Sequence, residues 1–225
     1  MGGRGASSAG SRGGVAKGTL VLPDGSAIEF DGELHFDGND TSLKARAREN
    51  ITNWEARRVK NKIEYAYAVD ADGNPLGREI KGGKGSVRVP IYYHDTTDAV
   101  FTHIHPRGDG MLGGTFSSGD LMNFANHSQR TVRAAAKEGT YSISKGANFD
   151  AVGFKSFVRQ ANTDFSSSYR TKVKKYETDY RSGKITYNEY LTGNAKAFNT
   201  SLVELHEKYR GAQKQYGYSY TLEKV

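Results

Sequence analysis

The sequence predicts an α/β (α+β) protein in which a mixed sheet is flanked by helices and is followed by a C-terminal helical extension. Short strand patterns alternate with two helical patterns between residues 20 and 146, and long polar helical patterns begin at about Phe149. The length of 225 residues fits one domain with appendages or two small domains. We therefore expect a disordered Gly/Ser/Arg-rich arm (1–18), an α/β domain (19–148), and a helical hairpin that ends in a strand (149–225).

The composition limits the chemistry and the partners of the chain. Lys and Arg number 32 against 25 Asp and Glu, and the net charge of +7 favours acidic surfaces, phosphates or nucleic acid as partners. The absence of cysteine excludes disulfides, thiolate metal ligands and a cysteine nucleophile, so any metal must be held by His, Asp or Glu. No apolar run approaches a membrane span and no hydrophobic signal segment is found, so we expect a cytoplasmic protein without membrane contact.

The N-terminal part of the chain predicts an arm, a hairpin and a helix. Residues 1–18 consist mainly of Gly, Ser, Ala and basic residues with almost nothing to bury, which is typical of disorder. Apolar residues then flank the turn signal at residues 23–25, which predicts a β-hairpin. Asp40, Thr41 or Ser42 is expected to cap a helix that runs to about Lys62.

The middle of the sequence predicts several strands and a second helix. The stretch "IEYAYAVDADGNPLGREI" alternates in polarity around a tight turn at residues 72–74, which predicts a strand, a turn and another strand. Further strands are expected in "KGGKGSVRVPIYY" and in "DAVFTHIH". Residues 117–139 have helical character, and "TYSISKG" (140–146) predicts a strand that closes the domain.

The C-terminal part predicts two long polar helices and a final strand. A helix-breaking pair, Ser182-Gly183, separates the two helical patterns. The tail "YGYSYTLEKV" then alternates in the manner of a strand.

Two glycine-rich stretches match phosphate-binding motifs in part of their sequence but lack a feature that each motif requires. Residues 108–113 satisfy G-x-G-x-x-G, but the expected helix begins several residues after the last glycine, whereas a dinucleotide loop must place its helix N-terminus on the pyrophosphate. The sequence "GGKGS" at 82–86 imitates a P-loop, but Gly85 stands where Ser or Thr must hold magnesium.

His103 and His105 are the first candidate metal ligands. Side chains two residues apart on a strand point to the same face of the sheet, so these two imidazoles can bind one zinc ion. A catalytic zinc needs a third protein ligand, which Asp120 can supply because the intervening loop is rich in glycine. Ser117 lies one helical turn before Asp120 and faces the same place.

Each of these patterns also has a structural interpretation without a metal. The two histidines can be ordinary surface residues, and Ser117-x-x-Asp120 before an apolar run is similar to a capping box. The cap and the metal site are compatible, because a capped helix start would hold Asp120 rigidly.

The combined pattern resembles a known family. His103-x-His105-Pro106 followed by Ser117-x-x-Asp120 resembles the signature of JAB/MPN-type (JAMM) zinc metalloproteases, in particular phage- and prophage-borne members. The upstream stretch "EYAYAVDADGNPL" is similar to the strand–turn–strand that carries the catalytic glutamate of the family, here Glu64. The resemblance covers residues 42–146 and implies a JAB/MPN-like metal-binding domain with cytidine-deaminase-like layering.

The resemblance also implies a chemistry. His103, His105 and Asp120 would hold Zn²⁺, Glu64 would act as the general base, and Ser117 would stabilise the oxyanion. The reaction would be hydrolysis of a peptide or isopeptide bond in a protein substrate, such as a ubiquitin-like modifier or a phage structural protein. The protein would then work in the cytoplasm of a bacterial host or in a phage particle.

Two other functional classes remain open at this point. The same fold can serve as a non-catalytic, phage-associated structural or host-interaction module, which the flexible arm and the long polar helices favour. The charge of +7 also fits a basic, nucleic-acid-associated protein with weak contacts to DNA or RNA. Replacement of Glu64 by Gln would abolish the activity of an enzyme and leave a binding module unchanged.

Overall fold

The computed structural model describes residues 13–224, except residues 107 and 109. Helices and strands alternate in its first two thirds, and long helices dominate the last third. Along the described chain the elements are β1 (Gly14–Val21), β2 (Ala27–Phe36), α1 (Ala45–Arg58), β3 (Tyr65–Val69), β4 (Ile80–Lys81), α2 (Tyr92–Asp95), β5 (Val100–Ile104), α3 (Ser118–Asn126), β6 (Thr131–Ala136), β7 (Gly139–Lys145), α4 (Ala151–Arg181), α5 (Tyr187–Gly211), α6 (Gln213–Tyr216) and β8 (Tyr218–Lys224).

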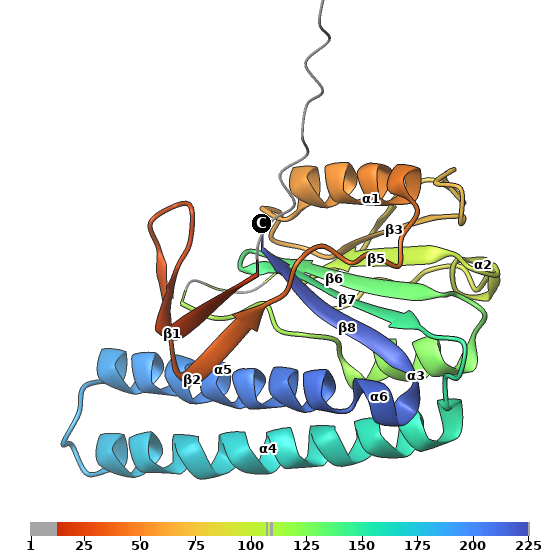
Figure 1. Cartoon of the computed structure of the whole chain (residues 1–225). Coiled ribbons are helices and arrows are strands. Elements are labelled where there is room, and N and C mark those ends of the chain that lie inside the picture. The colour runs from red at the N-terminus through yellow and green to blue at the C-terminus, as the bar shows by residue number, and fades with distance from the viewer. Residues whose placement is uncertain (1–12, 107, 109, 225) are drawn as a thin grey trace, which may run out of the picture.

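A six-stranded mixed sheet forms the centre of the molecule (Figure 1). Its strands are ordered β4-β3-β5-β6-β7-β8, and β5 and β6 run parallel while the other neighbours run antiparallel. The predicted class, α+β with a mixed sheet and flanking helices, is confirmed at this level.

Helices cover both faces of the sheet, α1 on one side and α3 to α6 on the other (Figure 1). Because successive side chains of a strand point to opposite faces, β5 contributes to both layers. Val100 packs in a cluster with Ala47 and Ile51 of α1, whereas Phe101 belongs to the large core that includes Phe124 of α3. His103 has the same parity as Phe101 and therefore faces the layer of α3 to α6.

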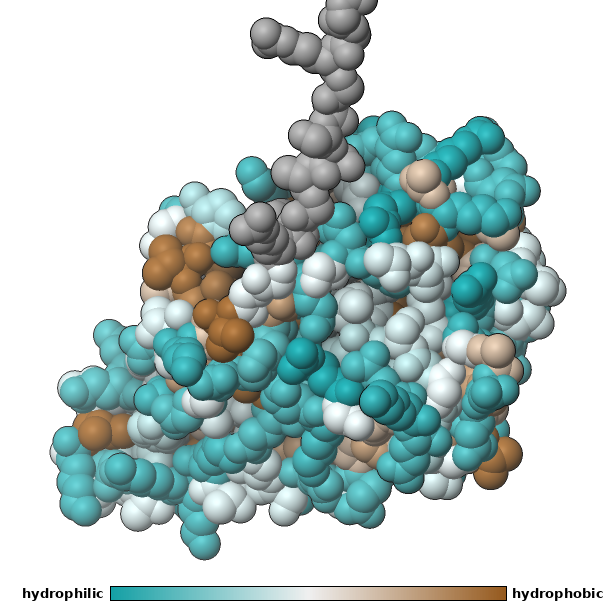
Figure 2. Space-filling view, in the orientation of Figure 1, coloured by the Kyte–Doolittle hydropathy of each residue, from teal (hydrophilic) through white to brown (hydrophobic). Residues whose placement is uncertain are grey.

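The predicted N-terminal hairpin is confirmed, but it begins earlier than expected. β1 and β2 pair antiparallel as a separate two-stranded sheet, and the buried residues Ile28, Phe30 and Leu34 of β2 join the large core. The predicted arm (1–18) overlaps this hairpin, because Gly14 to Gly18 belong to β1; residues 1–12 lie outside the described residues. Figure 2 shows hydrophobic residues gathered over the hairpin, where β1 exposes Val15 and Val21, on an otherwise largely hydrophilic face.

The predicted start of the first long helix is wrong. The helix begins at Ala45 with Lys44 as its N-cap, which makes no side-chain capping bond, and it ends at Arg58 rather than near Lys62. Asp40 does not cap it, because this carboxylate is buried and accepts a 2.6 Å hydrogen bond from Ser142 Oγ of β7. A long-range contact with the sheet thus replaces the local capping interaction.

Two further predictions in the middle of the chain are wrong. The stretch "TVRAAA" was expected to continue a helix but forms β6, whose six residues are all buried between β5 and β7. Helix propensity is a weak preference that burial inside a sheet overrides. Within residues 81–93, where a loop and another strand were expected, residues 82–90 form only a loop that leads into α2. The strand expected after the turn at 72–74 is present as β4 but is only two residues long.

The C-terminal part follows the prediction closely. α4 and α5 are separated at Ser182 and Gly183, and Gly183 adopts the left-handed conformation that favours glycine. The tail forms β8 and pairs with β7 at the edge of the six-stranded sheet. Phe154 of α4 and Leu205 of α5 belong to the large core, so the residues expected as an extension (149–225) share their core with the preceding part. Among the described residues, no helix combines the length and apolar character needed to cross a bilayer.

Candidate metal centre

The end of β5 carries the two predicted histidines on the face covered by α3 to α6. His103 lies within the strand and is almost fully buried, with 3 % of its side chain exposed. His105 follows the last residue of the strand, but its backbone N–H still donates to the Ala135 carbonyl at 2.9 Å. The ladder with β6 therefore continues past the strand end and holds both imidazoles on one face.

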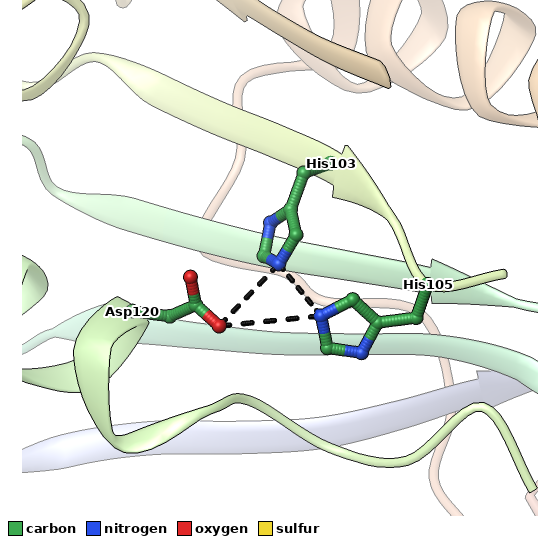
Figure 3. A group of neighbouring side chains, drawn as sticks. All are labelled: His103, His105 and Asp120. Carbon is green, nitrogen blue, oxygen red and sulfur yellow. Dashed lines mark hydrogen bonds and ion pairs between the residues drawn. The ribbon is translucent and has the colours of Figure 1, made fainter. Parts of the chain in front are cut away.

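Asp120 completes a group of three donor atoms with these histidines (Figure 3). Nε2 of His103 lies 2.8 Å from Nε2 of His105, and Oδ2 of Asp120 lies 3.5 Å from the first nitrogen and 4.0 Å from the second. A tetrahedral ion with bonds of about 2.0–2.1 Å would hold its ligand atoms about 3.3 Å apart. The three separations bracket this value, so the group could hold a metal ion with small side-chain adjustments.

A capping box fixes Asp120 at the start of α3, as the spacing predicted. Ser117 is the N-cap, and its Oγ accepts a hydrogen bond from the Asp120 N–H at 3.2 Å. Ser117 in turn donates to Asp120 Oδ2 from its backbone N–H at 2.8 Å and from its hydroxyl at 2.7 Å. The cap and the donor group share one carboxylate oxygen, so the helix start positions that oxygen next to the histidines.

The glycine-rich loop before α3 sets the tautomer of His105. The Gly114 carbonyl lies 3.1 Å from Nδ1 of His105, and because a carbonyl oxygen only accepts, Nδ1 must carry the proton. The lone pair of His105 Nε2 is then directed to His103 and Asp120, as a metal ligand requires.

Buried polar side chains from distant segments hold this loop. The carboxylate of Glu138 accepts hydrogen bonds from the N–H groups of Gly113 and Gly114 at 3.1 and 3.2 Å, and Asn199 of α5 accepts one from Leu112 at 2.9 Å. Burial raises the pKa of Glu138. The sequence prediction missed Glu138 and Asn199, since no local pattern links them to residues 112–114.

The ionisable groups of the centre shift one another's pKa values in opposite directions. Burial favours the neutral form of Asp120, but the positive charge of His103 and His105 and the hydrogen bonds from His103 and Ser117 hold the pKa of Asp120 well below its usual range. Burial likewise opposes the charged form of His103, yet the charge and hydrogen bond of Asp120 and the charge of Glu64 raise the pKa of this histidine. A metal ion that binds here takes the place of a proton.

Glu64 reaches the same end of the sheet from the neighbouring strand. The antiparallel register pairs Ala66 of β3 with His103, and the same register, continued by two residues, sets Glu64 opposite His105. Glu64 and Ala66 share a strand face, so Glu64 is directed to the histidine side of the sheet. Its charge contributes to the raised pKa of His103. The structure thus brings His103, His105, Asp120, Ser117 and Glu64 to one region.

Comparisons of the chain with protein-family models, with curated proteins and with solved structures found no match. The kind of site must therefore be inferred from its own donor atoms. Two imidazole nitrogens and one carboxylate oxygen, His103, His105 and Asp120, form a group that could hold a metal ion.

Proposed function

We propose that this protein is a zinc-dependent hydrolase of peptide or isopeptide bonds, with a JAB/MPN-like centre made by His103, His105 and Asp120. The observation that carries the proposal is the convergence of these three donor atoms within 4.8 Å of one another. Three protein ligands leave a fourth position open, which is the arrangement of catalytic zinc sites.

The chemistry of the donor atoms favours zinc over the hard cations. Magnesium and calcium select oxygen ligands, whereas imidazole suits zinc and other transition metals. Two histidines and one carboxylate also serve iron(II) in some oxygenases. Glu64 on the same face supports hydrolysis, because a carboxylate that accepts a proton is what activation of water needs.

The side chains of the centre have separate roles in the proposed reaction. When bound, zinc would supply a Lewis acid that polarises the carbonyl and lowers the pKa of water towards about 7. Glu64 accepts the proton of the attacking water as the new C–O bond forms, and it passes this proton to the amine nitrogen as the C–N bond breaks. Ser117 is exposed, so its hydroxyl can turn from Asp120 Oδ2 and donate to the oxygen of the tetrahedral intermediate.

The test compares two Glu→Gln variants on a proteome-derived peptide mixture, with cleavage products identified by mass spectrometry. Glu64→Gln keeps the size of the side chain but cannot accept the proton, so we expect cleavage to fall by about 10²–10⁴-fold with zinc content unchanged. Glu49→Gln is the matched control, because Glu49 is exposed on α1, which covers the other face of the sheet.

Equal cleavage by the wild type and Glu64→Gln would contradict the role of Glu64. If the zinc-loaded wild type cleaves nothing in the mixture, the hydrolase proposal fails in favour of a non-catalytic module. Iron in place of zinc in the purified protein would contradict the choice of metal.

A further inference from the structure

His105 borders two surface hollows with different linings, one rich in lysine and the other rich in aromatic and aliphatic side chains. The first has a volume of about 430 Å³, and four lysines contribute to its lining: Lys60, Lys62, Lys84 and Lys137. These lysines come from three separate segments, the segment that follows α1, the loop after β4 and the turn between β6 and β7. Within the described part of the chain, Lys60, Lys62 and Lys84 form no ion pair with a carboxylate, so their charge is available to a ligand.

The loop that carries Lys84 is tied to the backbone of Glu64. Glu64 donates from its N–H to the Gly83 carbonyl at 2.7 Å, and Gly82 donates to the Glu64 carbonyl at 2.8 Å. A Cβ at Gly82 would lie 2.5 Å from the Ser86 carbonyl, so the loop closes only with glycine there. The "GGKGS" stretch, which fails as a P-loop, thus anchors the segment that carries Lys84 to the backbone of Glu64, the proposed general base.

The second hollow is smaller and mostly apolar. Its volume is about 180 Å³, and beside His105 and Ser117 its lining includes Phe116, Phe165, Phe198, Leu202 and Leu205. Most of these apolar side chains come from α4 and α5, which pack against each other, and α4 also packs against α3 (Figure 1). The two long helices therefore form one wall next to the centre.

We infer that the ligand of this centre is a polypeptide with acidic side chains on one side of the scissile amide and a bulky apolar side chain on the other. The carboxylates would lie among Lys60, Lys62 and Lys84, and the apolar side chain would enter the hollow lined by Phe116 and Leu202. This assignment names the substrate class of the function proposed above and rests on it.

The apolar hollow is the reason to choose an acidic polypeptide over a nucleic acid. The lysines alone would also attract phosphates. A nucleic-acid strand, however, gains from bases stacked on aromatic faces along a basic groove, whereas the second hollow at His105 has a volume of only about 180 Å³, which suits one apolar side chain. An acidic and apolar peptide uses both hollows at once.

The test measures binding, so it does not depend on hydrolysis. Fluorescein-labelled twelve-residue peptides with a Glu/Asp-rich half and a Leu/Phe-rich half, synthesised in both orders, are titrated with the zinc-loaded Glu64→Gln variant at low ionic strength. Parallel peptides carry Gln/Asn in place of Glu/Asp, or Ala in place of Leu/Phe, and a twelve-nucleotide oligothymidine serves as the nucleic-acid probe. We expect one order of the acidic and apolar peptide to bind about tenfold more tightly than either substituted peptide.

Charge-reversal variants locate the binding on the protein. Lys60→Glu with Lys84→Glu should weaken binding of the acidic peptide by about tenfold, because two attractions become repulsions. Lys174→Glu with Lys175→Glu is the matched control, since both lysines are exposed on α4 and the net charge changes equally; binding should stay within about twofold.

Three binding results would overturn the inference. The first is equal binding of the acidic and the Gln/Asn peptides, and the second is equal effects of the two charge-reversal pairs. The third is tighter, Lys60- and Lys84-dependent binding of oligothymidine. The wild type is incubated with the same peptides in parallel: selective binding without cleavage would contradict the hydrolase proposal alone, and cleavage without the acidic preference would contradict this inference alone.

Discussion

Two buried polar clusters lie on opposite faces of the central sheet, and adjacent residues of β5 contribute to each. Thr102 points towards α1 and donates to Glu55 at 2.7 Å, and His103 points the other way into the candidate metal centre. In the first cluster the fully buried Arg133 donates to Glu55 at 2.8 and 3.0 Å and to Glu223 at 3.0 and 2.9 Å.

The two clusters differ in how their polar atoms are matched. Around Arg133, N–H and O–H donors meet the carboxylates of Glu55 and Glu223, so the guanidinium is paired with two carboxylates inside the protein. In the centre at His103, two ring nitrogens and a carboxylate oxygen, all capable of accepting, converge on one another. The first arrangement suits a structural role, and the second suits a positively charged ligand.

The largest expected effect comes from disrupting the buried cluster around Arg133. Arg133→Met removes the donor and leaves Glu55 and Glu223 buried without it, so we expect a loss of about 3–5 kcal/mol in the free energy of unfolding, measured by urea denaturation. Arg58→Met is the control, because Arg58 pairs with Glu79 in a partly exposed position, and it should cost about 1 kcal/mol or less. Equal losses in the two variants would erase the distinction between a buried network and a surface pair.

The next largest expected effect is the stabilisation of the folded protein by zinc bound at the candidate metal centre. At a free zinc concentration 100 times the Kd, binding to the folded state should add about 2.7 kcal/mol to the free energy of unfolding. Removal of zinc with a chelator should reverse this gain in the wild type and change nothing in His105→Ala. A gain of the same size in His105→Ala would show that zinc stabilises the protein from another place.

The smallest expected effect distinguishes the contribution of the Ser117 cap to stability from its contribution to zinc binding. Ser117→Ala and Thr186→Ala each remove the N-cap of a capping box, at the start of α3 and of α5 respectively, and each should cost about 1 kcal/mol in the free energy of unfolding. Only Ser117→Ala should also weaken zinc binding, because only its partner, Asp120, belongs to the metal centre. Equal zinc affinity in both variants would mean that the cap does not position the ligand.

Local patterns made much of the centre predictable from the sequence. His103 and His105 are two residues apart on a strand, and Ser117 and Asp120 are three apart at a helix start, so short-range geometry sets each pair. The folding of the loop that joins the pairs depends on Glu138 and Asn199, which lie 25 and 87 residues from their partners. Contacts of that range leave no periodic signal in a sequence.

The errors in the fold have the same physical origin. The alanines of β6 favour a helix locally but are buried between two strands. Asp is a preferred N-cap residue, yet the carboxylate of Asp40 accepts a hydrogen bond from Ser142, at a sequence separation of 102. In both cases a contact distant in sequence outweighs a local preference.

The most direct test of the central claim is the zinc content of four single variants beside the wild type. His105→Ala and Asp120→Ala remove ligands, and His127→Ala and Asp95→Ala are the controls, because His127 Nδ1 and Asp95 Oδ1 form a 2.7 Å His–Asp pair at a separate, more exposed position. After equilibration with zinc and gel filtration, mass spectrometry of the metal should find about one zinc per chain in the wild type and both controls. Both ligand variants should lose it, and full zinc content in His105→Ala and Asp120→Ala would contradict the account.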